Sequence, residues 1–301
     1  MNLENPSGWL RKFLCPPPGG VSLQISSGGA THVGMVRTNN EDCFRIVSPL
    51  NLFVLADGMG GEAHGEVASA LAVETVVKHC IEGEENPSAA LLGEAKPGLT
   101  PKSRRLLSAI HLANQKVFQS AEEHPERQGM GATLTTAWID GSQLSVGHVG
   151  DSRVYLLRTG QLQQLTSDHS LVAEQVRRGL LTATEAEQSN LQSVLLRALG
   201  TQAQVEVDVE EVGLFPGDVL LLCSDGLTRM VTEPEIAGTL QAEPIPQRAA
   251  EKLVQLANES GGIDNVTVIV VSFRPEPKGW FSWLRRGAQK SEGGNGSAGG
   301  K

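Results

Sequence analysis

The sequence predicts an α+β fold in which helices cover antiparallel β-sheets. Apolar, strand-like runs follow one another through short turns, of which Asp140-Gly141 is the clearest hairpin signal. The amphipathic helical patterns come in consecutive pairs instead of alternating with single strands. A doubly wound parallel sheet would require that alternation, so the pattern favours antiparallel sheets covered by helices.

The individual elements follow from local periodicity, read in chain order. Apolar runs or apolar–polar alternation predict strands, at 32–36, 44–47, 52–56, 133–139, 144–149, 154–157, 161–165, 205–209, 219–223 and 266–271. Helical spacing of apolar residues predicts helices, at 66–81, 102–122, 233–241 and 246–259, with a polar helical insertion at 166–200.

One folded domain is expected at 29–273. Residues 1–28 contain Pro16-Pro17-Pro18-Gly19-Gly20 and are expected to form a flexible N-terminal extension. Residues 274–301 end in a Gly/Ser-rich stretch and are expected to form a flexible C-terminal tail.

Composition narrows the class of protein. The 301 residues carry a net charge of −9, which argues against a nucleic-acid-binding protein, because such proteins present a basic surface. Neither a signal peptide nor an apolar run of transmembrane length is recognisable. The four cysteines are scattered without a C-x-x-C pair. We therefore expect a cytoplasmic protein with reduced thiols.

Acidic residues lie where apolar runs begin or end. Asp57 and Asp225 each follow a predicted strand, Asp264 precedes the last one, and Asn40-Glu41-Asp42 forms a further cluster. Carboxylates are costly to bury unless positive charge neutralises them. If these ends meet at one edge of a sheet, they form a cage of hard oxygen ligands suited to Mg²⁺ or Mn²⁺.

Nine short, motif-like segments follow one another along the chain, and they include the acidic residues just described. They are Gly34-Met35-Val36-Arg37 with Asn39-Asn40-Glu41-Asp42, Asp57-Gly58-Met59-Gly60-Gly61, Gly65-Glu66-Val67-Ala68-Ser69, Gly129-Met130-Gly131-Ala132-Thr133, Val149-Gly150-Asp151-Ser152-Arg153, Leu165-Thr166-Ser167-Asp168-His169-Ser170, Arg197-Ala198-Leu199-Gly200, Ser224-Asp225-Gly226-Leu227 and Gly261-Gly262-Ile263-Asp264-Asn265-Val266-Thr267. Together they resemble the metal-dependent Ser/Thr protein phosphatases of the protein phosphatase 2C (PPM) family, bacterial type.

The resemblance implies a four-layer α-β-β-α sandwich of two antiparallel sheets, with two Mn²⁺ or Mg²⁺ ions at one end. Carried over by position, Asp57 bridges both ions, the Gly58 carbonyl binds one of them, and Asp225 and Asp264 bind the other. The complete set of implied metal ligands is Glu41, Asp42, Asp57, Gly58, Asp151, Asp225 and Asp264.

Other residues of the motifs acquire roles in the same way. Glu41 and Asp42 match acidic residues that hold metal-bound water or orient ligands, and Asp151 resembles the carboxylate that helps to bind a third, weaker ion. Asn265 is expected to buttress Asp264. Arg37 would hold phosphate oxygens, since a planar guanidinium matches them with paired hydrogen bonds.

The implied reaction is hydrolysis of phosphoserine and phosphothreonine in proteins by a metal-activated bridging water. The catalytic set is Arg37, Asp57, Asp225 and Asp264. Many eukaryotic relatives have a histidine proposed as general acid directly after the Asp-Gly motif, where this chain has Met59. His64 and metal-bound water are alternatives for that role, and the sequence does not choose between them.

Two other functions are weighed against this one. A non-catalytic relative would bind phosphoproteins without hydrolysing them, and a hydrolase of small phosphoesters would use the same metal chemistry. The expected partners are phosphorylated proteins and a bacterial Ser/Thr kinase, without nucleic acid, and we expect a monomer. Trp9, Trp280 and Trp283 lie beside basic residues in the two tails, which suggests weak docking to a membrane surface or a partner protein.

Overall fold

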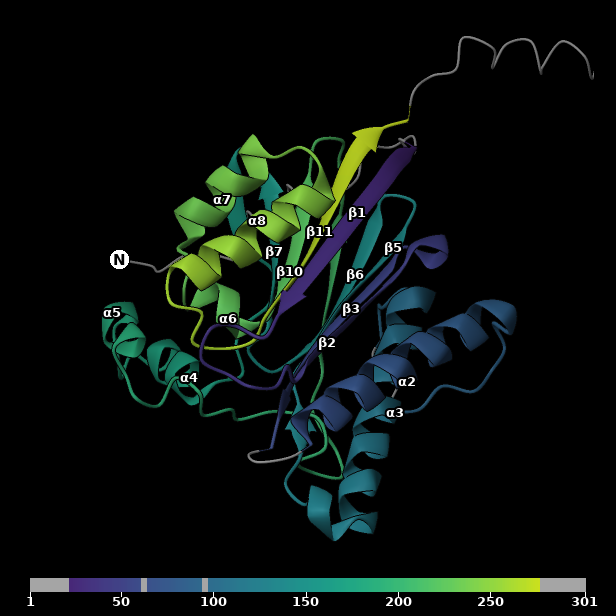
Figure 1. Cartoon of the computed structure of the whole chain (residues 1–301). Helices are drawn as coiled ribbons and strands as arrows, with labels where there is room; N and C mark the ends of the chain where they lie inside the picture. Colours follow the sequence, from purple (N-terminus) through teal and green to yellow (C-terminus); the bar gives the residue numbers. More distant parts are fainter. Residues whose placement is uncertain (1–21, 61–63, 94–96, 277–301) are drawn as a thin grey trace, which may run out of the picture.

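The computed structural model describes residues 22–60, 64–93 and 97–276. Two antiparallel sheets pack face to face, with helices on both outer surfaces (Figure 1). This architecture confirms the predicted four-layer α-β-β-α fold. Among the described residues, none of the helices combines the length and the apolar character needed to cross a membrane.

The first sheet contains five strands in the order β1-β11-β10-β7-β8. Their bounds are β1 Leu23–His32, β7 Arg153–Arg158, β8 Gln161–Gln164, β10 Val219–Cys223 and β11 Val266–Pro275. Three helices cover its outer face, namely α6 Asp225–Thr228, α7 Glu233–Ala242 and α8 Pro246–Glu259.

The second sheet has the order β2-β3-β5-β6-β9, with β4 paired to β3. Its strands are β2 Asp42–Val47, β3 Leu52–Met59, β4 Gly131–Ala132, β5 Leu134–Asp140, β6 Gln143–Val149 and β9 Asp208–Gly213. The long helices α2 Gly65–Glu85 and α3 Pro101–Glu123 cover it, and the 3-10 turns are η1 Ser48–Leu50 and η2 Pro125–Arg127.

Alternation of side chains along the strands produces the layers. In β3, Phe53 and Leu55 face the other sheet, whereas Val54 faces α2 and α3. In β10, Leu220 and Leu222 face the second sheet and Leu221 faces α7 and α8. Both sheets are therefore buried on two faces, which explains why their strands are continuous apolar runs in the sequence.

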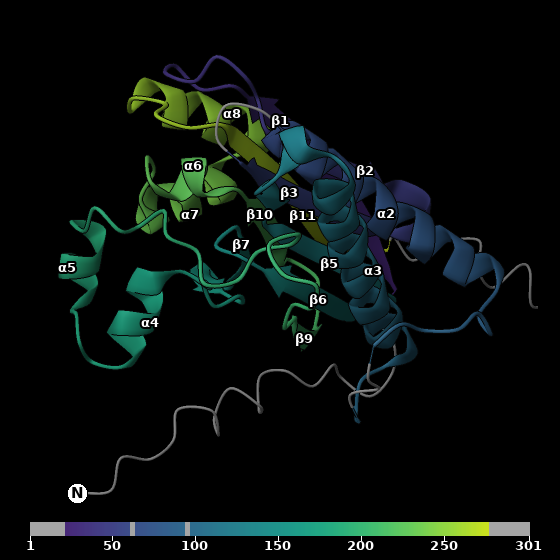
Figure 2. The same cartoon turned by 90° about the horizontal axis from the view of Figure 1, so that it is seen from below.

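The predicted insertion at 166–200 projects from one end of the sandwich (Figure 2). It contains α4 Leu171–Arg177 and α5 Ala183–Glu187. Ser170 and Thr182 cap these helices by accepting hydrogen bonds from the Ala173 and Glu185 amides, at 3.3 and 3.2 Å. These two short helices form a separate lobe at that end of the sandwich.

Two predicted strands are displaced in the structure. The strand expected at 32–36 is wrong, because residues 34–36 form a turn and the strand is β1, Leu23–His32. Ordered structure therefore begins before residue 29, within the predicted extension. The alternating residues 205–209 contribute to the core, but the paired strand there is β9, which starts at Asp208.

Candidate metal centre

The predicted ligands come from the same end of both sheets. Asp42 opens β2 and is paired in register with Asp57 of β3. Asp225 follows β10, and Asp264 precedes β11. The Ser224 hydroxyl donates to Asp42 Oδ2 at 2.9 Å and connects the two sheets at this point. The sandwich thus collects carboxylates that lie far apart in the chain.

A pocket of about 260 Å³ lies where these strand ends meet. Most of the predicted site residues line it, namely Arg37, Glu41, Asp57, Gly58, Asp151, Asp225 and Asp264. Asp42 lies behind the pocket, against Ser224. Within the described residues, no three or more His, Cys, Asp or Glu side chains are placed so that they could hold a metal ion as they stand. Ion binding would therefore require the carboxylate side chains that line the pocket to move.

Burial and mutual repulsion make the carboxylates hard to ionise in the metal-free protein. Burial raises the pKa of Asp57 well above its usual value, and the charges of Asp42, Asp225, Asp151 and Asp264 raise it further. Burial likewise raises the pKa of Asp42 and of Asp151, each to about 7. Such a concentration of acidic groups is unfavourable without a bound cation.

One buried oxygen behind the pocket fits a bound cation or a water held by one. Asp42 Oδ1 is buried and has no hydrogen-bond partner, whereas its Oδ2 accepts from Ser224. Unsatisfied buried carboxylate oxygens are rare because they lose their hydration without compensation. The donor set is all oxygen, and it fits Mn²⁺ or Mg²⁺.

Gly58 allows the backbone around the pocket to pack closely. A Cβ at this position would overlap the Gly65 carbonyl at the start of α2. The Gly58 amide donates to the Glu41 carbonyl at 3.1 Å, and that carbonyl also accepts from the Ser69 hydroxyl at 2.6 Å. α2 thus fixes both the Gly58 and the Glu41 segments.

Asn265 supports a different residue from the one expected. Its Oδ1 accepts from the Glu41 amide at 2.8 Å, and its Nδ2 donates to the carbonyls of Val33 and Asn39 at 3.0 and 2.9 Å. Only its backbone amide contacts Asp264, by donating to Oδ1 at 2.9 Å. The Asn265 side chain therefore holds the loop between β1 and β2, which carries Arg37 and Glu41.

A buried histidine positions the segment that carries Asp151. His169 Nδ1 accepts from the Gly150 amide at 3.1 Å, so its proton is on Nε2, which donates to Asp208 Oδ2 at 3.2 Å. His148 packs against the same ring at 4.8 Å between centroids. Neither histidine is among the residues that line the metal pocket, which is consistent with structural roles.

Two arginines line the pocket, of which the sequence motifs indicated only Arg37. Arg37 Nη2 lies 3.0 Å from Asp264 Oδ2. Arg229 Nη2 lies 2.6 Å from Asp225 Oδ2, and its Nη1 lies 3.6 Å from Asp264 Oδ2. The only sequence signal for Arg229 was its position four residues after Asp225, on the next turn of a helix.

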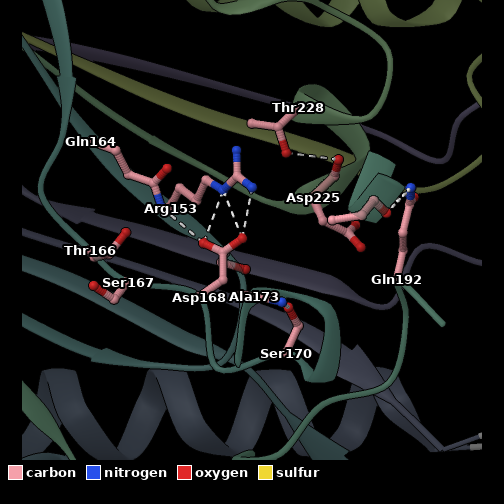
Figure 3. A network of polar contacts seen from close by, with 12 residues as sticks. Arg153, Gln164, Thr166, Ser167, Asp168, Ser170, Ala173, Gln192, Asp225 and Thr228 are labelled. Atoms are coloured by element: carbon pink, nitrogen blue, oxygen red, sulfur yellow. Dashed lines mark hydrogen bonds and ion pairs between the residues drawn. The ribbon is translucent and has the colours of Figure 1, made fainter. Parts of the chain in front are cut away.

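A larger cleft of about 1320 Å³ adjoins the metal pocket, and Asp151, Asp225 and Arg229 line both. Its other walls come from α4, from the segment after α5 and from the start of α7. Arg153 and Asp168, which also line the cleft, face each other in a paired contact (Figure 3). A polypeptide segment could lie in this cleft with one side chain in the metal pocket.

His64, considered above as a general acid, caps the start of α2. It is not among the described residues that line the metal pocket, whereas Met59 is. No described residue is thus assigned as the proton donor for the leaving group.

A carboxylate-lined pocket with two guanidinium groups, at the end of an α-β-β-α sandwich, defines a metal-dependent hydrolase of phosphate esters. The family model described as protein phosphatase 2C matches residues 29–259. The chain belongs to the protein phosphatase 2C family, and it is a metal-dependent protein phosphatase.

Known relatives agree with this assignment. The chain is 37% identical over 252 residues to the serine/threonine phosphatase stp of Listeria innocua, covering 83% of this chain and 96% of that protein. The crystal structure of the Mycobacterium tuberculosis serine/threonine phosphatase PstP/Ppp superposes with a TM-score of 0.73 at 36% identity, covering 83% of this chain and 99% of that one. The PstP catalytic domain solved with two manganese ions gives a TM-score of 0.70 at 35% identity, covering 84% of this chain and 100% of that one.

Proposed function

We propose that this protein removes phosphate from phosphoserine and phosphothreonine in proteins, using two Mn²⁺ or Mg²⁺ ions. The observation that carries the proposal is the meeting of Asp57, Asp225 and Asp264, from both sheets, in one pocket. Two divalent ions in such a pocket supply a water of lowered pKa and a clamp on the phosphate oxygens. The third, weaker ion expected at Asp151 is untested, and the position of Arg229, described below, argues against it.

The proposed roles of the residues follow their positions. Asp57 would hold both ions, since its carboxylate interacts with those of Asp42, Asp225 and Asp264 from both sheets, and the Gly58 carbonyl would add a ligand to one ion. Asp225 and Asp264 hold the other. Glu41 faces the pocket and Asp42 lies behind it, so we assign Glu41 to bound water and Asp42 to orienting the ligands.

The direct test is phosphate release from a phosphothreonine peptide with Mn²⁺, with EDTA, and by Asp225→Ala with Mn²⁺. Metal-dependent release that collapses in the variant supports the proposal. A folded protein that binds the peptide without releasing phosphate would support the non-catalytic alternative. Faster hydrolysis of free sugar phosphates than of the phosphopeptide would support the small-phosphoester alternative.

Arg37 is proposed to hold the phosphate of the substrate. Its side chain is 52% exposed and is paired only at one end, so it can turn from Asp264 to an incoming dianion. We expect Arg37→Ala to lower kcat/KM about 10- to 100-fold, the effect of losing a charge-assisted hydrogen bond. The loss should be equal for a phosphopeptide and for p-nitrophenyl phosphate, because the phosphate is common to both. A surface ion pair without a catalytic role would leave both rates unchanged.

The phosphatase domain expected at 29–273 is proposed to include also Leu23–Gly28 of β1 and Arg274 and Pro275 of β11, with the insertion at 166–200 as a flap that selects substrates. The flap supports this role because it forms one wall of the cleft beside the metal pocket. Exchange or deletion of 171–190 should change the relative rates on different phosphopeptides. Equal loss on all of them, or no change, would contradict the selective role.

Two neighbouring arginines provide a finer test of the flap. Arg177 lines the cleft and Arg178 does not, yet both pair with Glu174, at 2.7 and 2.6 Å. Arg177→Glu should shift the preference between acidic and basic phosphopeptides by about 5-fold, the effect of one exposed charge pair. Arg178→Glu is the matched control and should shift it less than twofold.

The proposed partners are phosphorylated proteins and the bacterial Ser/Thr kinase that modifies them, and we propose a monomer. A cytoplasmic location is proposed because the described cysteines, Cys43, Cys80 and Cys223, are free thiols. The docking role of Trp9, Trp280 and Trp283 concerns residues outside the described part of the chain and stays a prediction.

A further inference from the structure

Arg229 is a cation inside the carboxylate pocket that none of the proposed catalytic roles uses. It directly follows α6 and reaches back to Asp225 at 2.6 Å and across to Asp264 at 3.6 Å. One guanidinium thus pairs with two proposed metal ligands that belong to different segments of the chain. Such a position is where a bound cation would be expected.

A helical ion pair alone does not account for this arrangement. Asp225 and Arg229 are four residues apart, a spacing at which exposed pairs contribute little to stability. Here, however, their side chains are only 15% and 22% exposed, and the guanidinium also approaches Asp264. Buried carboxylates depend much more strongly on a positive neighbour than exposed ones do.

Arg229 also acts on Asp151, the residue from which a third ion was inferred. The negative charge of Asp225 repels the Asp151 carboxylate, and the positive charge of Arg229 attracts it. Asp151, Asp225 and Arg229 all line both the metal pocket and the adjoining cleft. The guanidinium therefore occupies the region that Asp151 and Asp225 share.

We propose that Arg229 takes the place of a third metal ion, so that this centre binds two ions and supplies the third positive group from its own chain. The inference deepens the proposed function, since it presumes the metal centre described above. Unlike a weakly bound ion, a guanidinium is present at every metal concentration, and Arg remains charged throughout the working pH range.

The charges of the pocket agree with this proposal. Five carboxylates line it, Glu41, Asp57, Asp151, Asp225 and Asp264, together with Arg37 and Arg229. Two divalent ions and these two arginines are enough to make the lining slightly positive, which suits a phosphate dianion. A third divalent ion would have to displace Arg229 from Asp225, and it would lack an uncompensated carboxylate to bind.

The test counts the Mn²⁺ ions bound per chain, by equilibrium dialysis, in the full-length protein and its variants. We expect the wild type to saturate at two ions. Arg229→Gln, which removes the charge but keeps much of the side-chain length, should bind a third ion, whereas Arg229→Lys should remain at two. Arg178→Gln is the matched control at an exposed arginine that lies outside both the pocket and the cleft, and it should also remain at two.

A second readout needs no metal. In EDTA, Arg229→Gln should lower the melting temperature by several degrees relative to Arg178→Gln, because Asp225 and Asp264 lose their cation. Added Mn²⁺ should then stabilise Arg229→Gln more than it stabilises the wild type.

Two results would overturn the proposal. One is saturation of the wild type at three ions, which needs no variant to fold. The other is an equal number of ions, with equal affinities, in the wild type and in Arg229→Gln. Two bound ions without phosphate release would contradict the proposed function but not the role of Arg229. Absence of any Mn²⁺ binding would contradict both.

Discussion

Replacing Asp57 by Asn is expected to reduce metal-dependent phosphate release by about 10³-fold or more and, at the same time, to stabilise the metal-free protein. The loss of activity follows because the proposed ligand to both ions is removed, and metal ions contribute several kcal/mol to such reactions. The gain in stability follows because burial and four neighbouring carboxylates raise the pKa of Asp57. At pH 7 folding must either protonate this carboxyl or hold its charge against the others, and an amide requires neither.

The measurement combines phosphate release with thermal unfolding in EDTA. Asp168→Asn is the matched control, because Asp168 is also buried in part but pairs with Arg153 at 2.7 Å. It should lower the melting temperature, since it leaves the Arg153 guanidinium without its partner. A metal-free Asp57→Asn protein that is less stable than the wild type would contradict the proposed repulsion among the buried carboxylates. An Asp57→Asn protein that keeps a tenth of the activity would contradict the proposed role of Asp57 as a metal ligand.

The second large effect concerns pH. The pKa values of Asp42 and Asp151 are raised from 3.8 to about 7 in the folded, metal-free protein, mainly by burial. Between these values the folded state binds more protons than the unfolded state, so the stability of the metal-free protein falls as pH rises from about 4 to about 7. One pKa unit corresponds to about 1.4 kcal/mol, so the fall should amount to a few kcal/mol.

Bound Mn²⁺ should remove this dependence, because the ions favour the ionised carboxylates and release their protons. Melting temperatures at pH 5, 6, 7 and 8, in EDTA and in saturating Mn²⁺, should therefore diverge as pH rises. Asp208 does not disturb the comparison, because its pKa is lowered to about 2, chiefly by His169, and its contribution is lost only below pH 4. Burial lowers the pKa of His148 to about 4, which raises stability as pH rises towards 6.5 in both conditions. The assignment would therefore be contradicted by melting temperatures in Mn²⁺ and in EDTA that do not diverge from pH 5 to pH 8.

The meeting of these acidic residues in one pocket was largely predictable from the sequence, because Asp57, Asp225 and Asp264 each adjoin an apolar strand. Asp57, Asp225 and Asp264 could be placed at strand ends before their neighbours in space were known. Helix α8 was predicted at its observed bounds, 246–259, because its apolar stripe is regular and it buries one face on the first sheet. In these cases the local pattern and the tertiary environment agree.

Strand β1 was misplaced because its sequence, which includes Ser26-Ser27-Gly28-Gly29, is typical of a loop. Tertiary contacts make it a strand. It pairs along its whole length with β11, and the bare backbone at Gly29 exchanges hydrogen bonds of 3.1 Å with the Gln247 side chain of α8. A larger residue at Gly28 would collide with the α8 backbone. Such close approach of a helix to a strand is not visible in local periodicity.

Strand β9 was displaced and Arg229 was missed for related reasons. Residues 205–207 alternate like a strand, but β6 ends at Val149 and the chain turns at Gly150, so the pairing of β9 with β6 begins only at Asp208. The contact of Arg229 with Asp264 depends on how α6 and the segment before β11 lie in space. Neither feature has a signature within a single stretch of sequence.

The antiparallel pairing of β1 with β11 also determines how this enzyme could be tethered. Leu23 pairs with Pro275 at one end of this ribbon, and His32 pairs with Val266 at the other, beside the metal centre (Figure 1). Both polypeptide segments that continue beyond the ribbon therefore leave from the same place, about 30 Å from the reaction site for strands of ten residues. A tether attached through either segment would hold the enzyme at the end opposite the metal centre. The catalytic end would then face the surrounding solution, from which its targets arrive.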